Sequence, residues 1–335
     1  MCCIVTTNDR AAGSIRRWGN IGLGLVAMAA LGLASGSAAA QTVGFATLPP
    51  GTLNHTTASA IAKVMKDKAG VNMLVQPTAG DTVILPMVNR GEAEIGIANA
   101  VELHNALAGE GPGGKLTDIR IIATAHPLKT AFWVRKDSTM QTVADLKGKR
   151  VVMGYSAMRV IDTLTRAMLA TGGLTAQDVR PVLVPNVVRG ADDFVSGAAD
   201  VYFFAFGAPK VREVEATVGG TRVLSIDEKG MPAARKVSKW GYLTGAAPGP
   251  IFVGVTKPMQ VYTFDNVLFT NAKVKDDLVY KFLDTLEKNK ADLIAIQPVL
   301  RPFSAKDGYK QYDVPYHPGA LKYFKERNYQ PVALQ

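Results

Sequence analysis

The stretch that most constrains the fold covers residues 76–99, which predict a strand, a turn, a helix and a second strand ending at Asn99. The turn, Thr78-Ala79-Gly80-Asp81, places a hydroxyl and a carboxyl where the helix begins. The first N–H groups of a helix lack internal partners and its dipole is positive there, so such a turn can hold a small anion. No pattern typical of bond breaking accompanies it, and we therefore expect capture of a molecule without chemistry.

The rest of the chain repeats this alternation of short apolar runs and helical periodicity. The pattern predicts an α/β protein with helices packed on a mostly parallel sheet. Residues 118–125 and 131–135 are expected to form two separate strands on either side of a short connection. Near the end of the chain, residues 275–296 are expected to form one helix.

Two lobes are expected because the pattern restarts after residue 136 and returns with a strand near residue 262. The first lobe would contain residues 41–136 and 263–335, and the second residues 137–262. A turn at residues 154–159 joins a strand to a helix start in the second lobe, as the turn at Gly80 does in the first. Ligands of open α/β sheets bind at the carboxyl ends of strands, which is where both turns lie.

Residues 1–40 are interpreted as a cleaved secretory signal. Arg10, Arg16 and Arg17 precede an apolar run at 21–34, and small residues follow up to Ala40. That charge, core and small-residue order is typical of a signal peptide. A membrane anchor is disfavoured because the run falls short of the ~20 apolar residues needed to span a bilayer. We therefore expect a periplasmic protein that does not span the membrane after cleavage.

Composition excludes several classes of function. Both cysteines, Cys2 and Cys3, lie in the signal, so the mature chain would have no thiol catalysis, cysteine metal site or disulfide. Removing three Arg and one Asp with the signal changes the formal charge from +10 to +8 (10 − 3 + 1). This favours small anionic molecules or an acidic partner. Nucleic acid is not expected, since the basic residues are dispersed and no recognition motif is present.

Several of the candidate site residues have two interpretations each. Ser156 and Asp81 are either ligand contacts or helix caps. Arg159 is either a clamp for a carboxylate or a solvated helix charge. His55 is either a ligand donor or a structural histidine, and the aromatic residues Tyr155 and Phe206 either stack on a ligand or pack in the core. The full set of expected ligand-binding residues is Thr47, Asn54, His55, Thr78, Ala79, Gly80, Asp81, Asn99, Tyr155, Ser156, Arg159 and Phe206.

The chain resembles the TAXI-type solute receptors of tripartite ATP-independent periplasmic (TRAP) transporters. The resemblance covers essentially the whole mature chain. It is carried by five segments in a characteristic order, which are residues 47–55, 78–81 with 91–96, 143–154, 200–209 and 314–320.

The resemblance implies a two-lobed periplasmic binding fold that is type II-like, in which each lobe is a mixed sheet flanked by helices and the ligand cleft lies between the lobes. Such a receptor closes over an organic anion or amino acid and hands it to membrane permease subunits. The resemblance also implies that helix-start turns of both lobes meet the ligand's carboxylate. Asn54 and His55 stand where the family has paired tyrosines. The turn at residues 78–81 and that at residues 157–160 depart from the family's Thr-Gly-Gly-Ser and Gly-Ser-Gly-Thr, and Ile84 replaces its asparagine. The resemblance thus implies a retained architecture with changed specificity.

We expect no enzyme, cofactor or metal site. His55, His126, Asp81 and Glu94 do not have close metal-ligand spacing, and no Gly-x-Ser-x-Gly elbow accompanies the histidines. A secreted hydrolase is therefore the remote alternative. The main alternative to the transport receptor has the same fold, but the protein reports the presence of its ligand to a membrane sensor.

Overall fold

A computed structural model describes residues 42–111 and 113–334, so the expected signal peptide lies outside the described residues. The first part alternates strands and helices: β1 (Val43–Thr47), α1 (Leu53–Ala69), β2 (Met73–Pro77), α2 (Asp81–Asn89), β3 (Ile95–Asn99) and α3 (Ala100–Ala108). β1 pairs in parallel with both β2 and β3. Within the described ranges, no helix is long and apolar enough to cross a membrane.

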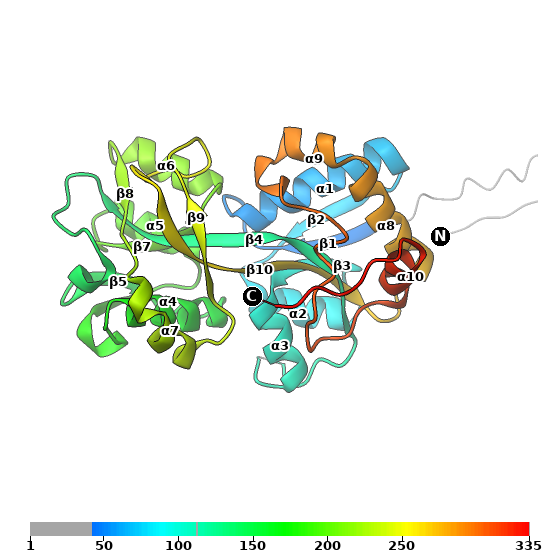
Figure 1. Cartoon of the computed structure of the whole chain (residues 1–335), viewed down its shortest axis with the longest axis horizontal. Coiled ribbons are helices and arrows are strands. Elements are labelled where there is room, and N and C mark those ends of the chain that lie inside the picture. Colours follow the sequence, from blue (N-terminus) through cyan, green and yellow to red (C-terminus); the bar gives the residue numbers. More distant parts are fainter. Residues whose placement is uncertain (1–41, 112, 335) are drawn as a thin grey trace, which may run out of the picture. The chain divides into compact units, whose positions relative to one another are not determined.

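Two long antiparallel strands, β4 (Ile119–Arg135) and β10 (Met259–Asn271), connect the two halves of the fold (Figure 1). One end of β10 pairs with β3, and the other end pairs with β9 (Tyr242–Ala246). The far end of β4 pairs with β7 (Tyr202–Ala205) and β8 (Thr221–Val223). The eight-stranded sheet is therefore mixed, as expected for a receptor of this fold, and it is not the mostly parallel sheet that periodicity alone indicated.

The prediction of two strands at 118–125 and 131–135 was wrong, because β4 is continuous through Pro127. A proline lacks the N–H that a strand ladder uses, which is why its segment resembled a connection. Here Pro127 lies opposite Asp265, next to a shift in register between Asn266 and Val267. The partner strand β10 continues on both sides of this irregularity and holds β4 extended.

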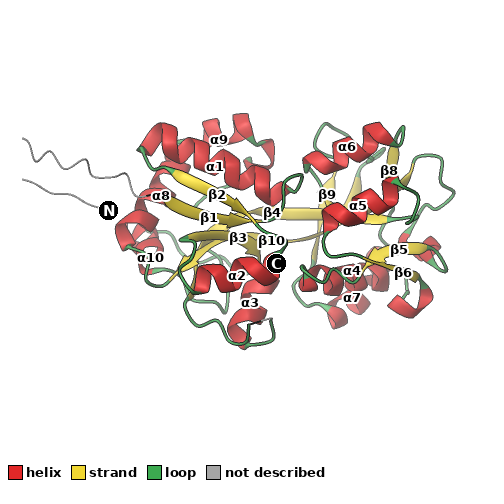
Figure 2. Cartoon of the chain, turned by 180° about the vertical axis from the view of Figure 1, so that it is seen from behind, coloured by secondary structure: helices red, strands yellow, loops and turns green. Residues whose placement is uncertain are grey.

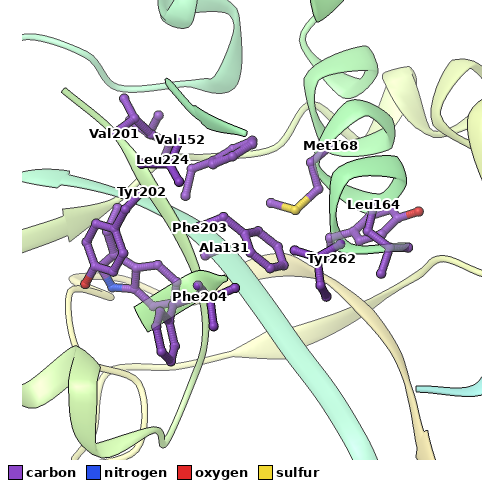
Figure 3. Close-up of a cluster of buried hydrophobic side chains, with 14 of the residues drawn as sticks. Ala131, Val152, Leu164, Met168, Val201, Tyr202, Phe203, Phe204, Leu224 and Tyr262 are labelled. Carbon is purple, nitrogen blue, oxygen red and sulfur yellow. The ribbon is translucent and has the colours of Figure 1, made fainter. Parts of the chain in front are cut away.

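The elements between β4 and β10 pack around a core of their own. They are η1 (Val143–Leu146), β5 (Arg150–Met153), α4 (Arg159–Thr171), η2 (Ala176–Asp178), β6 (Arg180–Leu183), α5 (Val187–Val195), β7, α6 (Pro209–Thr217), β8, η3 (Glu228–Gly230), α7 (Met231–Val237) and β9. Figure 3 shows Leu164 and Met168 of α4 directed toward Phe203 of β7 and Ala131 of β4. This core orients the start of α4.

The C-terminal elements return to the first strands. α8 (Asp276–Lys288), α9 (Lys290–Ile296), η4 (Pro298–Leu300) and α10 (Pro318–Glu326) follow β10. The single helix expected at 275–296 is two helices, since Asn289 has φ −113° and ψ 31°, which breaks the helix between α8 and α9. α1, α8 and α9 contact one another over one face of the β1–β3 sheet, while α2 and α3 cover the other (Figure 2).

We call β1 to α3 together with α8 to α10 the first lobe, and η1 to β9 the second lobe, with β4 and β10 passing through both. The expected boundary near residue 136 follows the end of β4, whereas the boundary near residue 262 lies inside β10. The residue limits of the lobes stay a prediction.

Candidate functional site

The carboxyl ends of β1, β2 and β3 lie at one edge of the first lobe because the three strands are parallel neighbours. Thr47 ends β1, and its buried Oγ1 has no hydrogen-bond partner among the described residues. Thr78 follows β2, and its N–H donates to the Thr47 carbonyl at 2.8 Å. Asn99 ends β3 and caps α3 by accepting from the Glu102 N–H at 3.0 Å. The fold thus gathers three of the expected residues at one edge.

The start of α2 contacts the turn that leads into α4. The N–H and the hydroxyl of Thr82 both donate to the Ala157 carbonyl, at 3.3 and 3.1 Å. A Cβ built on Gly80 would lie only 1.9 Å from that carbonyl oxygen, so this approach requires glycine. The two turns expected to face one another therefore do meet, and a backbone carbonyl takes the position at α2 that an anion would need.

A pair of buried carboxyl groups lies beside this contact. Asp81 is 2% exposed and its Oδ1 has no partner among the described residues, while Glu102 is 4% exposed and accepts from the Val160 N–H at 3.3 Å. Burial raises the pKa of Asp81 to about 7. Burial, together with the charge of Asp81, raises the pKa of Glu102 to about 8. An anion is disfavoured next to this pair whenever either group is ionised.

Helix capping, one of the two interpretations of Asp81 and Ser156, is wrong. The cap of α2 is Gly80, without a side-chain hydrogen bond, and Asp81 is the first residue inside the helix. The cap of α4 is Met158, because Tyr155 adopts φ 20° and delays the helix to Arg159. The strand-to-helix turn is therefore longer than the sequence pattern indicated.

The other expected residues of the second lobe do not gather around one point. Ser156 and Arg159 are exposed, as is Ala79 in the first lobe. Tyr155 is fully buried, and its hydroxyl donates to the Val152 carbonyl at 3.2 Å. Its ring packs edge to face with Phe203. A role of these residues in binding stays a prediction.

A buried polar network links the first lobe to the two long strands. The Asn266 amide donates to Asn54 Oδ1 at 2.9 Å and lies 3.3 Å from His126 Nε2. His126 Nδ1 lies 3.0 Å from the Pro127 carbonyl, so this nitrogen carries the proton and Nε2 accepts from Asn266. Burial lowers the pKa of His126 to about 4, which keeps the ring neutral. Half-buried His55 lies one residue beyond Asn54, and burial lowers its pKa as well.

Phe206 lines a cavity of about 290 Å³ at the start of α1. Leu53 of α1 and Val299 of η4 come from the first lobe, and Phe252 comes from the segment between β9 and β10. Lys129 of β4 contributes a charged group to this cavity. The lobes also meet nearby, where the Lys210 N–H donates to the Gly51 carbonyl at 3.1 Å.

Sequence reasoning missed Glu102, Lys129 and Asn266. Glu102 follows the predicted Asn99 by three residues, which is the signal that could have found it. Lys129 and Asn266 lie in strands, and no local pattern indicates which strand residues face a cavity. Among the described residues, no group of three or more His, Cys, Asp or Glu side chains is arranged to hold a metal ion.

A comparison of this chain with known protein families identifies the family to which it belongs. The model described as the NMT1-like family matches residues 45–327. This chain belongs to the NMT1-like family. The match includes both turns, the acid pair and the Phe206 cavity.

Solved structures share the fold at low sequence identity. A periplasmic transporter protein is 14% identical, with 87% of this chain and 94% of that chain covered and a TM-score of 0.57. MatC from Rhodopseudomonas palustris with bound malate is 13% identical, covering 78% and 90%, with a TM-score of 0.53. A binding protein component of an ABC phosphonate transporter from Pseudomonas aeruginosa is 11% identical, covering 78% and 79%, with a TM-score of 0.52. The expected fold of two-lobed periplasmic binding proteins is thereby confirmed.

Proposed function

We propose that this chain is a periplasmic receptor that captures a small organic anion or amino acid between its two lobes and performs no chemistry on it. The observation that carries the proposal is the cavity lined by Leu53 of the first lobe and Phe206 of the second, beside strands that run through both. Binding residues supplied by two connected lobes allow closure around a solute. The bound malate of MatC supports an organic anion as the solute.

We propose further that the receptor delivers its solute to the membrane permease subunits of a TRAP transporter. Support comes from the TAXI-like segments in the sequence, which include residues 200–209 and 314–320. An ABC permease is the second candidate partner, favoured by the shared fold with the binding component of an ABC phosphonate transporter. The proposed periplasmic location rests on the signal-like residues 1–40.

A thermal-shift screen of purified residues 41–335 tests the receptor function. Carboxylates, amino acids, sulfonates and phosphonates would be added one at a time, and hits would be titrated by calorimetry. A solute that binds only the native state raises the melting temperature in a saturable way. Failure of every class to bind, or turnover of any solute followed by mass spectrometry, would contradict the proposal. Co-purification with candidate permease subunits would then distinguish the TRAP from the ABC partner.

A further inference from the structure

The Phe206 cavity has the construction of a small-molecule site. Its volume of about 290 Å³ is close to the lower end of the usual range of ligand pockets, ~300–1,000 Å³. Its walls come from both lobes, with Leu53 and Val299 on one side and Phe206 and Phe252 on the other. The Phe206 and Phe252 rings lie 5.3 Å apart at 61°, and Trp133 supports Phe206 from behind at 4.8 Å. The aromatic wall is therefore held in place.

The charged groups of the cavity are all positive. Lys129 is half-buried, and its Nζ donates to the Gly245 carbonyl at 2.5 Å and lies 5.3 Å from the centre of the Phe252 ring. Arg301 stands exposed at the rim. The residues lining the cavity include no acid, and within the described part of the chain no carboxylate forms an ion pair with Lys129. Partial burial lowers the pKa of Lys129, as expected of an ammonium group that is partly shielded from water without a counter-charge.

A second cavity beside the long strands contains a carboxylate among its lining residues. It has a volume of about 330 Å³ and is lined by Asp265, Tyr242 and Tyr312. The Asp265 carboxylate there already forms an ion pair with Lys310 at 2.8 Å. The start of α2 is also unsuited to an anion, because the Ala157 carbonyl occupies it and Asp81 and Glu102 lie beside it. Of these three places, the surroundings of Lys129 accommodate an anionic solute best.

We infer that the Phe206 cavity binds a small aromatic carboxylate, with the carboxylate on Lys129 Nζ and the ring against Phe206 and Phe252. The inference rests on the proposed receptor function and names the class of its solute. A flat apolar ring matches the aromatic wall, and a single negative charge supplies the counter-ion that Lys129 lacks. Arg301 at the rim adds long-range attraction for an incoming anion.

Calorimetry with benzoate, benzamide and acetate as probes tests the inference on the unmodified receptor. Benzamide keeps the ring without the charge, and acetate keeps the charge without the ring. Benzoate is expected to bind at least about tenfold more tightly than either, because a charge-assisted hydrogen bond and the ring contacts each contribute to its affinity. Equal affinity for benzoate and benzamide would overturn the assignment without any substitution in the protein.

Substitutions then locate the site. Lys129→Gln keeps most of the side-chain stem and is expected to weaken benzoate binding about tenfold or more, whereas Lys129→Arg restores much of it. Lys257→Gln is the matched control, since it removes the same charge from an exposed position outside the cavity. Circular dichroism confirms that each variant is folded.

The possible results distinguish a failure of the site assignment from a failure of the receptor function. A solute that binds the wild-type chain and Lys129→Gln equally well would overturn the site assignment and leave the receptor function standing. Binding of other solute classes with no binding of benzoate would do the same. If no solute of any class binds, the receptor function and the site assignment fail together.

Discussion

The side chains of Asp81 and Glu102 are buried beside one another, and their burial raises the pKa of both carboxyl groups. A sequence pattern presents Asp81 as a helix cap, but the first lobe places it one residue inside α2 and against Glu102. Neither carboxyl has a cationic partner among the described residues. The ionised pair is therefore costly to bury.

The free energy of unfolding is expected to depend on pH through these two groups. The native pKa of Asp81 is about 7 and that of Glu102 about 8, above the ordinary values of 3.8 and 4.5. The unfolded chain therefore releases these protons first as pH rises. Their contribution to stability is complete below about pH 4 and is lost as pH rises through the native pKa values.

Urea unfolding of the wild type, Asp81→Asn and Glu102→Gln at pH 5 and pH 8.5 measures this dependence. Each variant is expected to lose less stability than the wild type between the two pH values. Exposed Asp137→Asn is the control and should follow the wild type. An Asp81→Asn variant with the wild-type pH dependence would show that this carboxyl ionises normally in the native state.

At the scale of the elements, α4 positions the second-lobe turn. Its apolar face, which includes Leu164 and Met168, packs into the core around β7, while its first residue, Arg159, is exposed. Because α4 is packed along its length, the position of its first turn is fixed. The position of the Ala157 carbonyl relative to α2 is fixed with it. The packed face of α4 therefore contributes to the contact between the lobes.

Leu164→Ala is expected to lower the free energy of unfolding by about 2–5 kcal/mol, since Leu164 is fully buried and its removal leaves a cavity. Leu183→Ala is the matched control, because Leu183 in β6 is 76% exposed, and it should change stability by less than about 0.5 kcal/mol. Chemical denaturation followed by circular dichroism measures both. Equal effects of the two substitutions would mean that α4 is not packed as described.

At the scale of the whole molecule, Asp265 joins segments that are far apart in the sequence. Its carboxylate accepts from Lys310 Nζ at 2.8 Å, from the Tyr312 hydroxyl at 2.7 Å and from the Tyr242 hydroxyl at 2.8 Å. These partners belong to the C-terminal segment and to β9, while Asp265 itself lies in β10. One buried carboxylate thus ties both lobes to a strand that they share.

Asp265→Asn is expected to destabilise the protein by about 3 kcal/mol, because it removes the buried counter-charge of Lys310 while leaving the lysine in place. The melting temperature should fall accordingly, and proteolysis should cut the C-terminal segment sooner. Asp137→Asn again serves as the exposed control. A melting temperature unchanged by Asp265→Asn would contradict the structural role given to this network.

Local patterns predicted the α/β class and the positions of β1 to α3, because strand and helix periodicity and turn residues act over a few neighbouring positions. That helix-start turns of both lobes face one site was implied by the family resemblance. They failed at β4, where only pairing with β10 keeps the chain extended through Pro127. They also failed at residues 275–296, where the backbone breaks at Asn289.

The turn at residues 78–81 shows which properties of a site can be predicted from the sequence alone and which cannot. The sequence by itself determined that Gly80 would begin a helix at the carboxyl end of a strand, since small residues and backbone geometry suffice for that. Only the tertiary structure decided that the Ala157 carbonyl would fill that helix start, that Asp81 would be buried beside Glu102, and that Lys129 would line an apolar cavity. Burial and charge pairing depend on residues distant in the sequence, and these set the chemistry of the site.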